Sequence, residues 1–227
     1  MGQDPLVCRF MRGLHRLRPP KLFPTWDIVT VLNRLLSWGD TKQLPLKKLL
    51  MKTAFLVALV CYKRPADLCN MQVVGGYWQL DMRGFSCQPL RYGKTEPHNR
   101  VPPIKIEPFL KNPELCSVYH LVRLEKSLVK LRPQSETRFW LSSRNTYKAI
   151  TPITMCRWLK EVIVDTDSLS GTVRDVRPVG ASTTVQANMD IKRVREAANW
   201  QQLSTLQRHY FKPQSLQSLT EILNVTS

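Results

Sequence analysis

One segment of the chain is apolar almost all the way round a helix, and it limits how the rest can fold. Residues 46–60 read LKKLLMKTAFLVALV, and Pro45 in front of them suits the first position of a helix, where its missing N–H is not needed. From Ala54 onward no polar face is left, so other elements must cover this helix on all sides. The apolar run from Thr53 to Cys61 is flanked by lysines and is shorter than the ~20 residues that span a bilayer. The segment therefore predicts the central helix of a folded domain, with no membrane partner.

Helical and β patterns alternate around this central segment. Apolar residues at three-to-four spacing run from Trp26 to Leu36, with Thr25 as N-cap and Gly39 at the exit. The same spacing predicts later helices at 117–131, 153–164, 182–187, 190–198, 203–211 and 215–223. Between about Val73 and Ile106 the pattern alternates and is punctuated by Gly and Pro, which indicates a small antiparallel sheet. A further short strand is expected at 139–141. The fold class is therefore α+β, a mostly helical domain with a small antiparallel β-sheet insert.

The chain divides into two unequal parts. Residues 1–24 are basic and interrupted by proline, and we interpret them as a linker or the remnant of an N-terminal DNA-binding domain. Residues 25–227 form one domain. The basic arm at 9–21 either contacts DNA or is a solvated tail, and the sequence leaves both interpretations open. No stretch resembles a signal peptide, because no continuous apolar run follows the first positive charges.

Charge points to a polyanionic partner. The chain has 34 Lys+Arg against 17 Asp+Glu, a formal net charge of +17, and 43% hydrophobic residues. A chain of this composition can bury a core. Its positive charge raises the concentration of polyanions near the surface; nucleic acid is the first candidate partner and an anionic membrane surface is the second. The six cysteines and four histidines are scattered without the short spacings of zinc ligands. We therefore expect reduced thiols, no metal and no cofactor.

Six residues occupy positions where ordinary surface side chains are less expected. Arg64 ends the apolar helix just before Pro65, with Asp67 placed to orient it. The others are a lysine in a predicted hairpin, two arginines before a predicted helix, and two aromatic residues near the end: Lys94, Arg174, Arg177, Trp200 and Tyr210. Taken singly, such an arginine or lysine is usually a solvated charge, and such a tyrosine is usually half-buried packing. Their order along the chain is more informative than any one of them.

That order resembles the catalytic domain of the tyrosine recombinases, the phage-integrase family. The family pattern is Arg, Lys, His-x-x-Arg, His or Trp, and Tyr. Here the matching segments are KRPADL, GKTEPHNRVPPI, RDVR, EAANW and QRHYF. The sequence most resembles the recombinases of DIRS-type eukaryotic mobile elements, and the resemblance covers roughly residues 4–213. It implies a nuclear protein that acts on double-stranded DNA and needs no small-molecule substrate.

The resemblance also implies a role for each site residue. Tyr210 would attack the scissile phosphorus and form a 3′-phosphotyrosyl intermediate, which preserves the energy of the phosphodiester bond. Arg64 and Arg177 would hold the non-bridging oxygens, because guanidinium groups match them in geometry and stay charged. Lys94 would give a proton to the leaving 5′-hydroxyl. Trp200 would orient the phosphate through its indole N–H.

Two departures weaken the match. Arg174 stands where the family has the histidine of His-x-x-Arg, and a guanidinium cannot shuttle protons at neutral pH. Pro178 directly follows Arg177, and it is expected to push Arg177 toward extended backbone. A catalytically decayed or domesticated protein that only binds DNA is therefore an alternative. An unrelated RNA-binding protein is a third, although no RNP or KH motif is present.

The resemblance also bears on assembly. Family members work as tetramers on DNA and exchange C-terminal helices, and residues 215–223 (SLQSLTEIL) fit such a helix. The same helix could instead pack on its own domain. The sequence decides neither this point, nor the target site, nor whether recombination integrates or excises.

Overall fold

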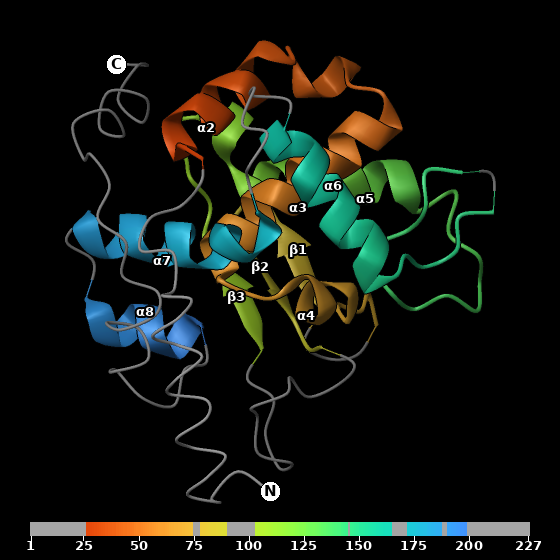
Figure 1. The fold of residues 1–227 in the computed structure, drawn as a ribbon. Coiled ribbons are helices and arrows are strands. Elements are labelled where there is room, and N and C mark those ends of the chain that lie inside the picture. Colours follow the sequence, from red (N-terminus) through yellow and green to blue (C-terminus); the bar gives the residue numbers. More distant parts are fainter. Residues whose placement is uncertain are drawn as a thin grey trace, which may run out of the picture.

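The computed structural model describes residues 26–74, 78–89, 103–144, 146–164, 172–187 and 190–198. Helix α3 (Leu46–Cys61) lies at the centre of this part (Figure 1). Every residue from Leu49 to Leu59 is buried, and α3 packs against helices α5 (Ser117–Leu128), α6 (Pro152–Val164) and α7 (Val176–Gln186). The apolar pattern of this segment therefore predicted its place correctly. Pro45 is the N-cap, one position before the expected one.

The remaining helices surround this centre. Helix α2 (Ile28–Ser37) contacts α6, α4 (Pro65–Cys69) directly follows the end of α3, and α8 (Ile191–Ala197) packs against α7. Three short 3₁₀ turns connect them: η1 (Thr41–Gln43), η2 (Pro113–Leu115) and η3 (Val173–Asp175). The N-cap of α2 is Asp27, whose carboxylate accepts the Thr30 N–H at 2.7 Å. The expected N-cap at Thr25 was wrong, because the aspartate two residues on satisfies the first turn.

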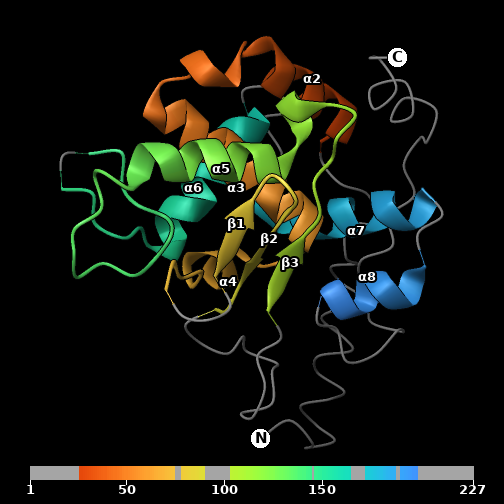
Figure 2. The same cartoon turned by 180° about the vertical axis from the view of Figure 1, so that it is seen from behind.

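A three-stranded antiparallel sheet lies beside α3 and α5 (Figure 2). Strands β1 (Gln79–Asp81), β2 (Gly84–Cys87) and β3 (Ile104–Ile106) pair in sequence order. Alternate residues of β2 and β3 face the core, so that Phe85 lies opposite Ile106 in the register. This sheet confirms the predicted insert and the α+β class.

Two predicted elements differ in the structure. Residues 139–141 form no strand; isolated bridges join the preceding Arg138 to Gln72 and Leu141 to Ala149. This apolar segment is buried without being a strand: Phe139 and Trp140 pack edge to face inside the core, with their ring centroids 4.9 Å apart. Helix α7 begins at Val176, six residues before the predicted start. In the described residues no helix is long and apolar enough to cross a membrane.

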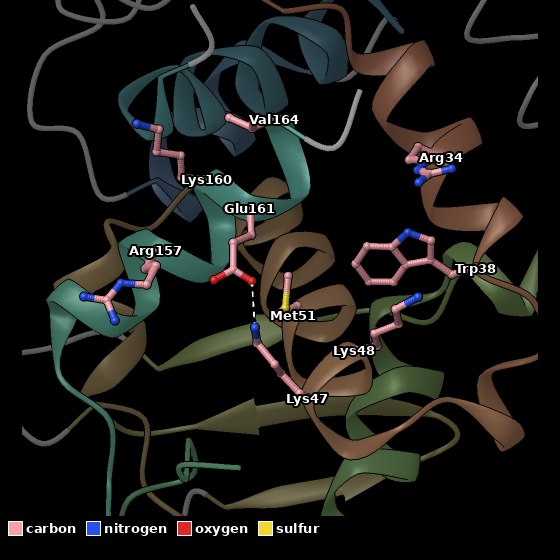
Figure 3. A pocket seen from close by; sticks show the side chains of 9 residues that line it. All are labelled: Arg34, Trp38, Lys47, Lys48, Met51, Arg157, Lys160, Glu161 and Val164. Carbon is pink, nitrogen blue, oxygen red and sulfur yellow. Dashed lines mark hydrogen bonds and ion pairs between the residues drawn. The ribbon is translucent and has the colours of Figure 1, made fainter. Parts of the chain in front are cut away.

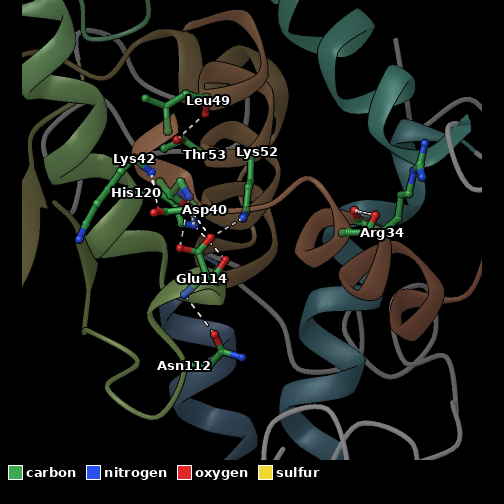
Figure 4. A network of polar contacts seen from close by, with 11 residues as sticks. Arg34, Asp40, Lys42, Leu49, Lys52, Thr53, Asn112, Glu114 and His120 are labelled. Carbon is green, nitrogen blue, oxygen red and sulfur yellow. Dashed lines mark hydrogen bonds and ion pairs between the residues drawn. The ribbon is translucent and has the colours of Figure 1, made fainter. Parts of the chain in front are cut away.

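A buried polar network fastens α3 to the segment that enters α5 (Figure 4). Lys52 is completely buried on α3, and its ammonium lies 2.8 Å from a carboxylate oxygen of Glu114 in η2. Glu114 also accepts the hydroxyl of Thr41. The backbone carbonyl of Glu114 lies 2.9 Å from Nε2 of the buried His120. These contacts compensate the burial of a lysine that the sequence alone places at the edge of an apolar run.

Candidate active site

The candidate site begins where α3 ends. Tyr62 closes the helix with a left-handed backbone (φ 51°, ψ 31°), a conformation that costs a non-glycine residue about 1–3 kcal/mol. Its buried hydroxyl donates a hydrogen bond to Thr184 Oγ1 on α7 at 2.7 Å, and burial raises the pKa of Tyr62. This turn redirects the chain, so that Lys63 and Arg64 leave the end of α3 at a fixed place.

Helix α7 lies directly against that end of α3. A Cβ added to Gly180 would lie 2.3 Å from the carbonyl oxygen of Leu59, so only glycine permits this approach. Thr184, which accepts the Tyr62 hydroxyl, donates its own proton to the Gly180 carbonyl at 2.8 Å. The end of α3 and helix α7 are therefore joined by a backbone contact and by the hydrogen bond from Tyr62 to Thr184.

Arg64 is anchored through its backbone. It is the N-cap of α4, and its N–H donates to Asp67 Oδ2 at 3.1 Å. Asp67 therefore fixes the backbone of Arg64, whereas the sequence suggested that it would orient the guanidinium. The arginine is half-buried.

Arg177 lies in the first turn of α7 and is only 8% exposed. Its Nη2 donates to the carbonyl oxygen of Ala198, the C-cap of α8, at 2.7 Å. The prediction that Pro178 forces Arg177 into extended backbone was wrong, because both residues are helical. Pro178 falls in the first helical turn, whose N–H groups have no partner within the helix, so its ring is tolerated there.

A small apolar cluster connects these pieces. It consists of Tyr62, Ala181, Val194 and Ala198, from the end of α3, the middle of α7, and α8 with its C-cap. Arg64 follows Tyr62 by two residues, and Arg177 is bound to Ala198. The fold thus brings both arginines to the same end of α3. Trp200 follows Ala198 by two residues in the sequence but lies outside the described residues.

The other predicted site residues divide into two groups. Arg174 lies in η3 and is exposed, and the neighbouring Asp175 is buried and accepts the Thr172 hydroxyl at 2.9 Å. Lys94 and Tyr210, like Trp200, lie outside the described residues. Since β2 and β3 pair antiparallel, the sequence places Lys94 in the connection between two neighbouring strands.

Lys63 is a site residue that sequence reasoning did not select. It is 8% exposed, directly precedes Arg64, and its positive charge acts to lower the pKa values of Cys61 and Cys87. Burial outweighs that effect and raises the pKa of each of these thiols to about 12. Lys63 is therefore a buried cation just beyond the end of α3. The only sequence signal was a lysine that directly follows the apolar run and precedes Arg64.

The electrostatics of this end suit a phosphate group. Lys63, Arg64 and Arg177 bring three cations to the last turn of α3 and its neighbours, and arginine pairs with phosphate through parallel N–H donors. In the described ranges no three His, Cys, Asp or Glu side chains lie close enough to hold a metal ion. The five described cysteines are free thiols.

Comparison with solved structures identifies this architecture as the tyrosine recombinase fold. The chain aligns with XerA recombinase at a TM-score of 0.59 and 16% identity, covering 95% of this chain and 71% of XerA. It aligns with the site-specific recombinase XerH at a TM-score of 0.59 and 16% identity. That alignment covers 89% of this chain but only 54% of XerH, whose structure is a post-cleavage complex with palindromic difH substrate. No protein-family model and no curated protein matches the sequence.

Proposed function

We propose that this chain is a DNA strand transferase of the tyrosine recombinase type. The observation that carries the proposal is the junction of α3, α7 and α8, where Arg177 is bound to the C-cap of α8 and Arg64 follows Tyr62 of the apolar cluster by two residues. Those two residues match the two arginines of the family pattern. The fold shared with recombinases supports the assignment.

In the proposed reaction the phenolic oxygen of Tyr210 bonds to the scissile phosphorus as the bond to the 5′ oxygen breaks. The phenolic proton passes to solvent, and the leaving 5′ oxygen takes a proton from Lys94. Arg64 and Arg177 neutralise the charge that gathers on the non-bridging oxygens. A free 5′-hydroxyl then returns a proton to Lys94 as its oxygen bonds to the phosphorus. The bond to Tyr210 breaks, the phenolate takes a proton from solvent, and the strand is rejoined.

Finer assignments belong to the same proposal. The sequence resemblance supports a DIRS-type mobile-element recombinase that acts in the nucleus. The segment 215–223 supports assembly as a tetramer on DNA through exchanged C-terminal helices. Residues 1–24 serve as a basic linker or the remnant of a DNA-binding domain that precedes the catalytic domain.

A second candidate function is DNA binding without cleavage. One observation favours it: Arg174 replaces the family histidine, so the site has no imidazole at that position. The helical placement of Arg177 removes the objection raised by Pro178. The balance between the two candidates depends on whether the reaction proceeds without that imidazole.

A covalent trapping experiment separates them. The full chain is incubated with a pool of labelled, nicked duplexes whose core is randomised, so that the target sequence need not be known. Cleavage beside the nick releases a short fragment that diffuses away, which leaves the protein covalently attached to DNA on a denaturing gel. The expected result is an adduct from the wild type and none from Tyr210→Phe.

Tyr119→Phe is the matched control, because Tyr119 is a half-buried tyrosine on α5. It is expected to form the adduct at the wild-type level. An adduct that persists in Tyr210→Phe contradicts the assignment of the nucleophile. Salt-sensitive binding with no adduct at any duplex in the pool supports the non-catalytic candidate instead.

A further inference from the structure

A basic groove lies at the opposite end of α3 from the candidate active site. Figure 3 shows that its side chains come from α2, α3 and α6, and it encloses about 640 Å³. Five lining residues are cationic and one is acidic: Arg34, Lys47, Lys48, Arg157, Lys160 and Glu161. From Lys47 to Tyr62 the helix advances roughly 22 Å at 1.5 Å per residue. The groove is therefore a separate site.

The groove is built on rigid elements that present their charges together. Arg157, Lys160 and Val164 are spaced three and four residues apart, which places them on one face of α6. Lys48 lies over the ring of Trp38, with its ammonium 5.4 Å from the centroid. Lys47 is bound to Glu161 at 2.9 Å, so the single carboxylate is already paired.

The position of the lysines is unfavourable for the isolated protein. Lys47 and Lys48 lie in the first turn of α3, whose N-cap Pro45 provides no side-chain hydrogen bond and whose first turn has no acidic residue. Cations at the positive end of a helix are disfavoured, and like charges crowded in one groove repel each other. Arg157 and Lys160 are exposed, and neither forms an ion pair with the part of the chain that the structure describes. A bound anion would relieve these repulsions.

The composition of the groove distinguishes among polyanions. Protein–protein interfaces are depleted in lysine, whereas three of the five cations that line this groove are lysines: Lys47, Lys48 and Lys160. Nucleic-acid interfaces are strongly positive and polar. The Trp38 ring is already covered by Lys48, which favours contact with a sugar–phosphate backbone over stacking of a base.

We propose that this groove binds the phosphodiester backbone of a nucleic-acid segment other than the one held at the candidate active site. The contact is independent of base sequence, because its donors are ammonium and guanidinium groups directed at phosphates. The proposal stands apart from the proposed chemistry, since it uses none of the residues assigned to strand transfer.

Protection of individual lysines from acylation tests the proposal on the full chain. A 20-bp duplex, a 20-nucleotide single strand, poly-glutamate of equal charge and inorganic phosphate are titrated separately, and mass spectrometry follows each lysine. We expect the duplex or the single strand to protect Lys48 and Lys160 but not the exposed Lys126 and Lys130. No protection at saturating nucleic acid overturns the proposal, and so does protection at lower concentration by poly-glutamate or by phosphate.

A matched pair of variants locates the contact. Arg157→Gln removes one groove cation, and Arg144→Gln removes an exposed arginine from the loop that precedes Ala149. Loss of one phosphate contact at 0.15 M salt is expected to raise the nucleic-acid concentration for half-protection of Lys48 and Lys160 about fivefold. Arg144→Gln is expected to leave it unchanged. Equal shifts of the half-protection concentration in both variants would mean that the groove contributes no more than any other surface charge, which would overturn the proposal.

The two proposals fail separately. Tyr210→Phe is expected to keep the protection of Lys48 and Lys160, because the groove needs no cleavage. Arg157→Gln is expected to form the covalent adduct at the wild-type level with a short nicked duplex. Protection without an adduct leaves the groove assignment standing, and an adduct without protection leaves only the strand-transfer assignment.

Discussion

Acidification should destabilise this fold through one buried histidine. His120 is fully buried on α5, and its Nε2 lies 2.9 Å from the carbonyl oxygen of Glu114. A carbonyl can only accept, so this nitrogen carries the proton of the neutral ring and Nδ1 does not. Nδ1 is buried without a hydrogen-bond partner within the described residues. Protonation would therefore place a charge on a buried ring whose Nδ1 has no acceptor among the described residues.

Burial, with the nearby Lys52 ammonium, lowers the pKa of His120 from 6.5 to about 4, against the opposing effects of Glu114. Between these values the unfolded chain binds a proton that the folded chain does not. The stability present above pH 6.5 is thus lost as the pH falls, and the loss is complete near pH 4. At 1.36 kcal/mol per pKa unit the total is about 3 kcal/mol, of which about 2 kcal/mol falls between pH 7 and pH 4.5.

Urea unfolding at pH 7 and pH 4.5 measures this loss. His120→Gln is the matched control, since the glutamine amide can donate to the same carbonyl and does not titrate. Carboxylates contribute equally to both proteins, so the wild type should lose about 2 kcal/mol more than the variant over this interval. Identical losses in the two proteins would refute the reasoning. So would an NMR titration that finds the pKa of His120 near 6.5.

Two further substitutions test the packing of α3. Glu114→Gln should lower the free energy of unfolding by about 3–5 kcal/mol in urea titrations, because it leaves the fully buried Lys52 ammonium without its counter-charge. Lys52→Met should cost less, since the side chain of Glu114 is 32% exposed and water can solvate it; the reverse order would contradict this account. Gly180→Ala should destabilise by about 1–3 kcal/mol, because its methyl group would meet the Leu59 carbonyl. It should also reduce covalent adduct formation more than DNA binding, and wild-type adduct levels in a folded variant would contradict the role of this contact.

Periodicity alone predicted the helices that have one clear apolar pattern. Helices α3, α5 and α6 were found within a few residues of their expected bounds, because each has one clear apolar pattern. The start of α7 was predicted six residues too late, at residue 182, and Pro178 was expected to favour extended backbone at Arg177. The proline occupies the first turn, and the glycine serves a close approach to α3. The contact that requires this glycine is with Leu59, about 120 residues away in the sequence, so no local pattern predicts it.

The same limit applies to charged residues. Lys52 appeared to bound the apolar run, and it is the most deeply buried cation of the described chain because Glu114, 62 residues later, compensates it. Similarly, the sequence shows the order of the site residues, but the placement of Arg64 and Arg177 at the same end of α3 depends on the packing of α7 against α3. Sequence order indicates which chemistry is present, and tertiary packing decides which groups act together.

The position of α3 separates two groups of positive charge in the fold. A helix that is apolar in its middle can display charge only at its ends, and here both ends are cationic. Lys47 and Lys48 open the basic groove, whereas Lys63 and Arg64 lie at the candidate active site. Beyond the Debye length of about 8 Å at physiological salt, solvent-exposed charges largely stop interacting, and these ends are roughly 22 Å apart. Neutralising one end should therefore leave the anion affinity of the other unchanged, which a single diffuse basic surface would not allow.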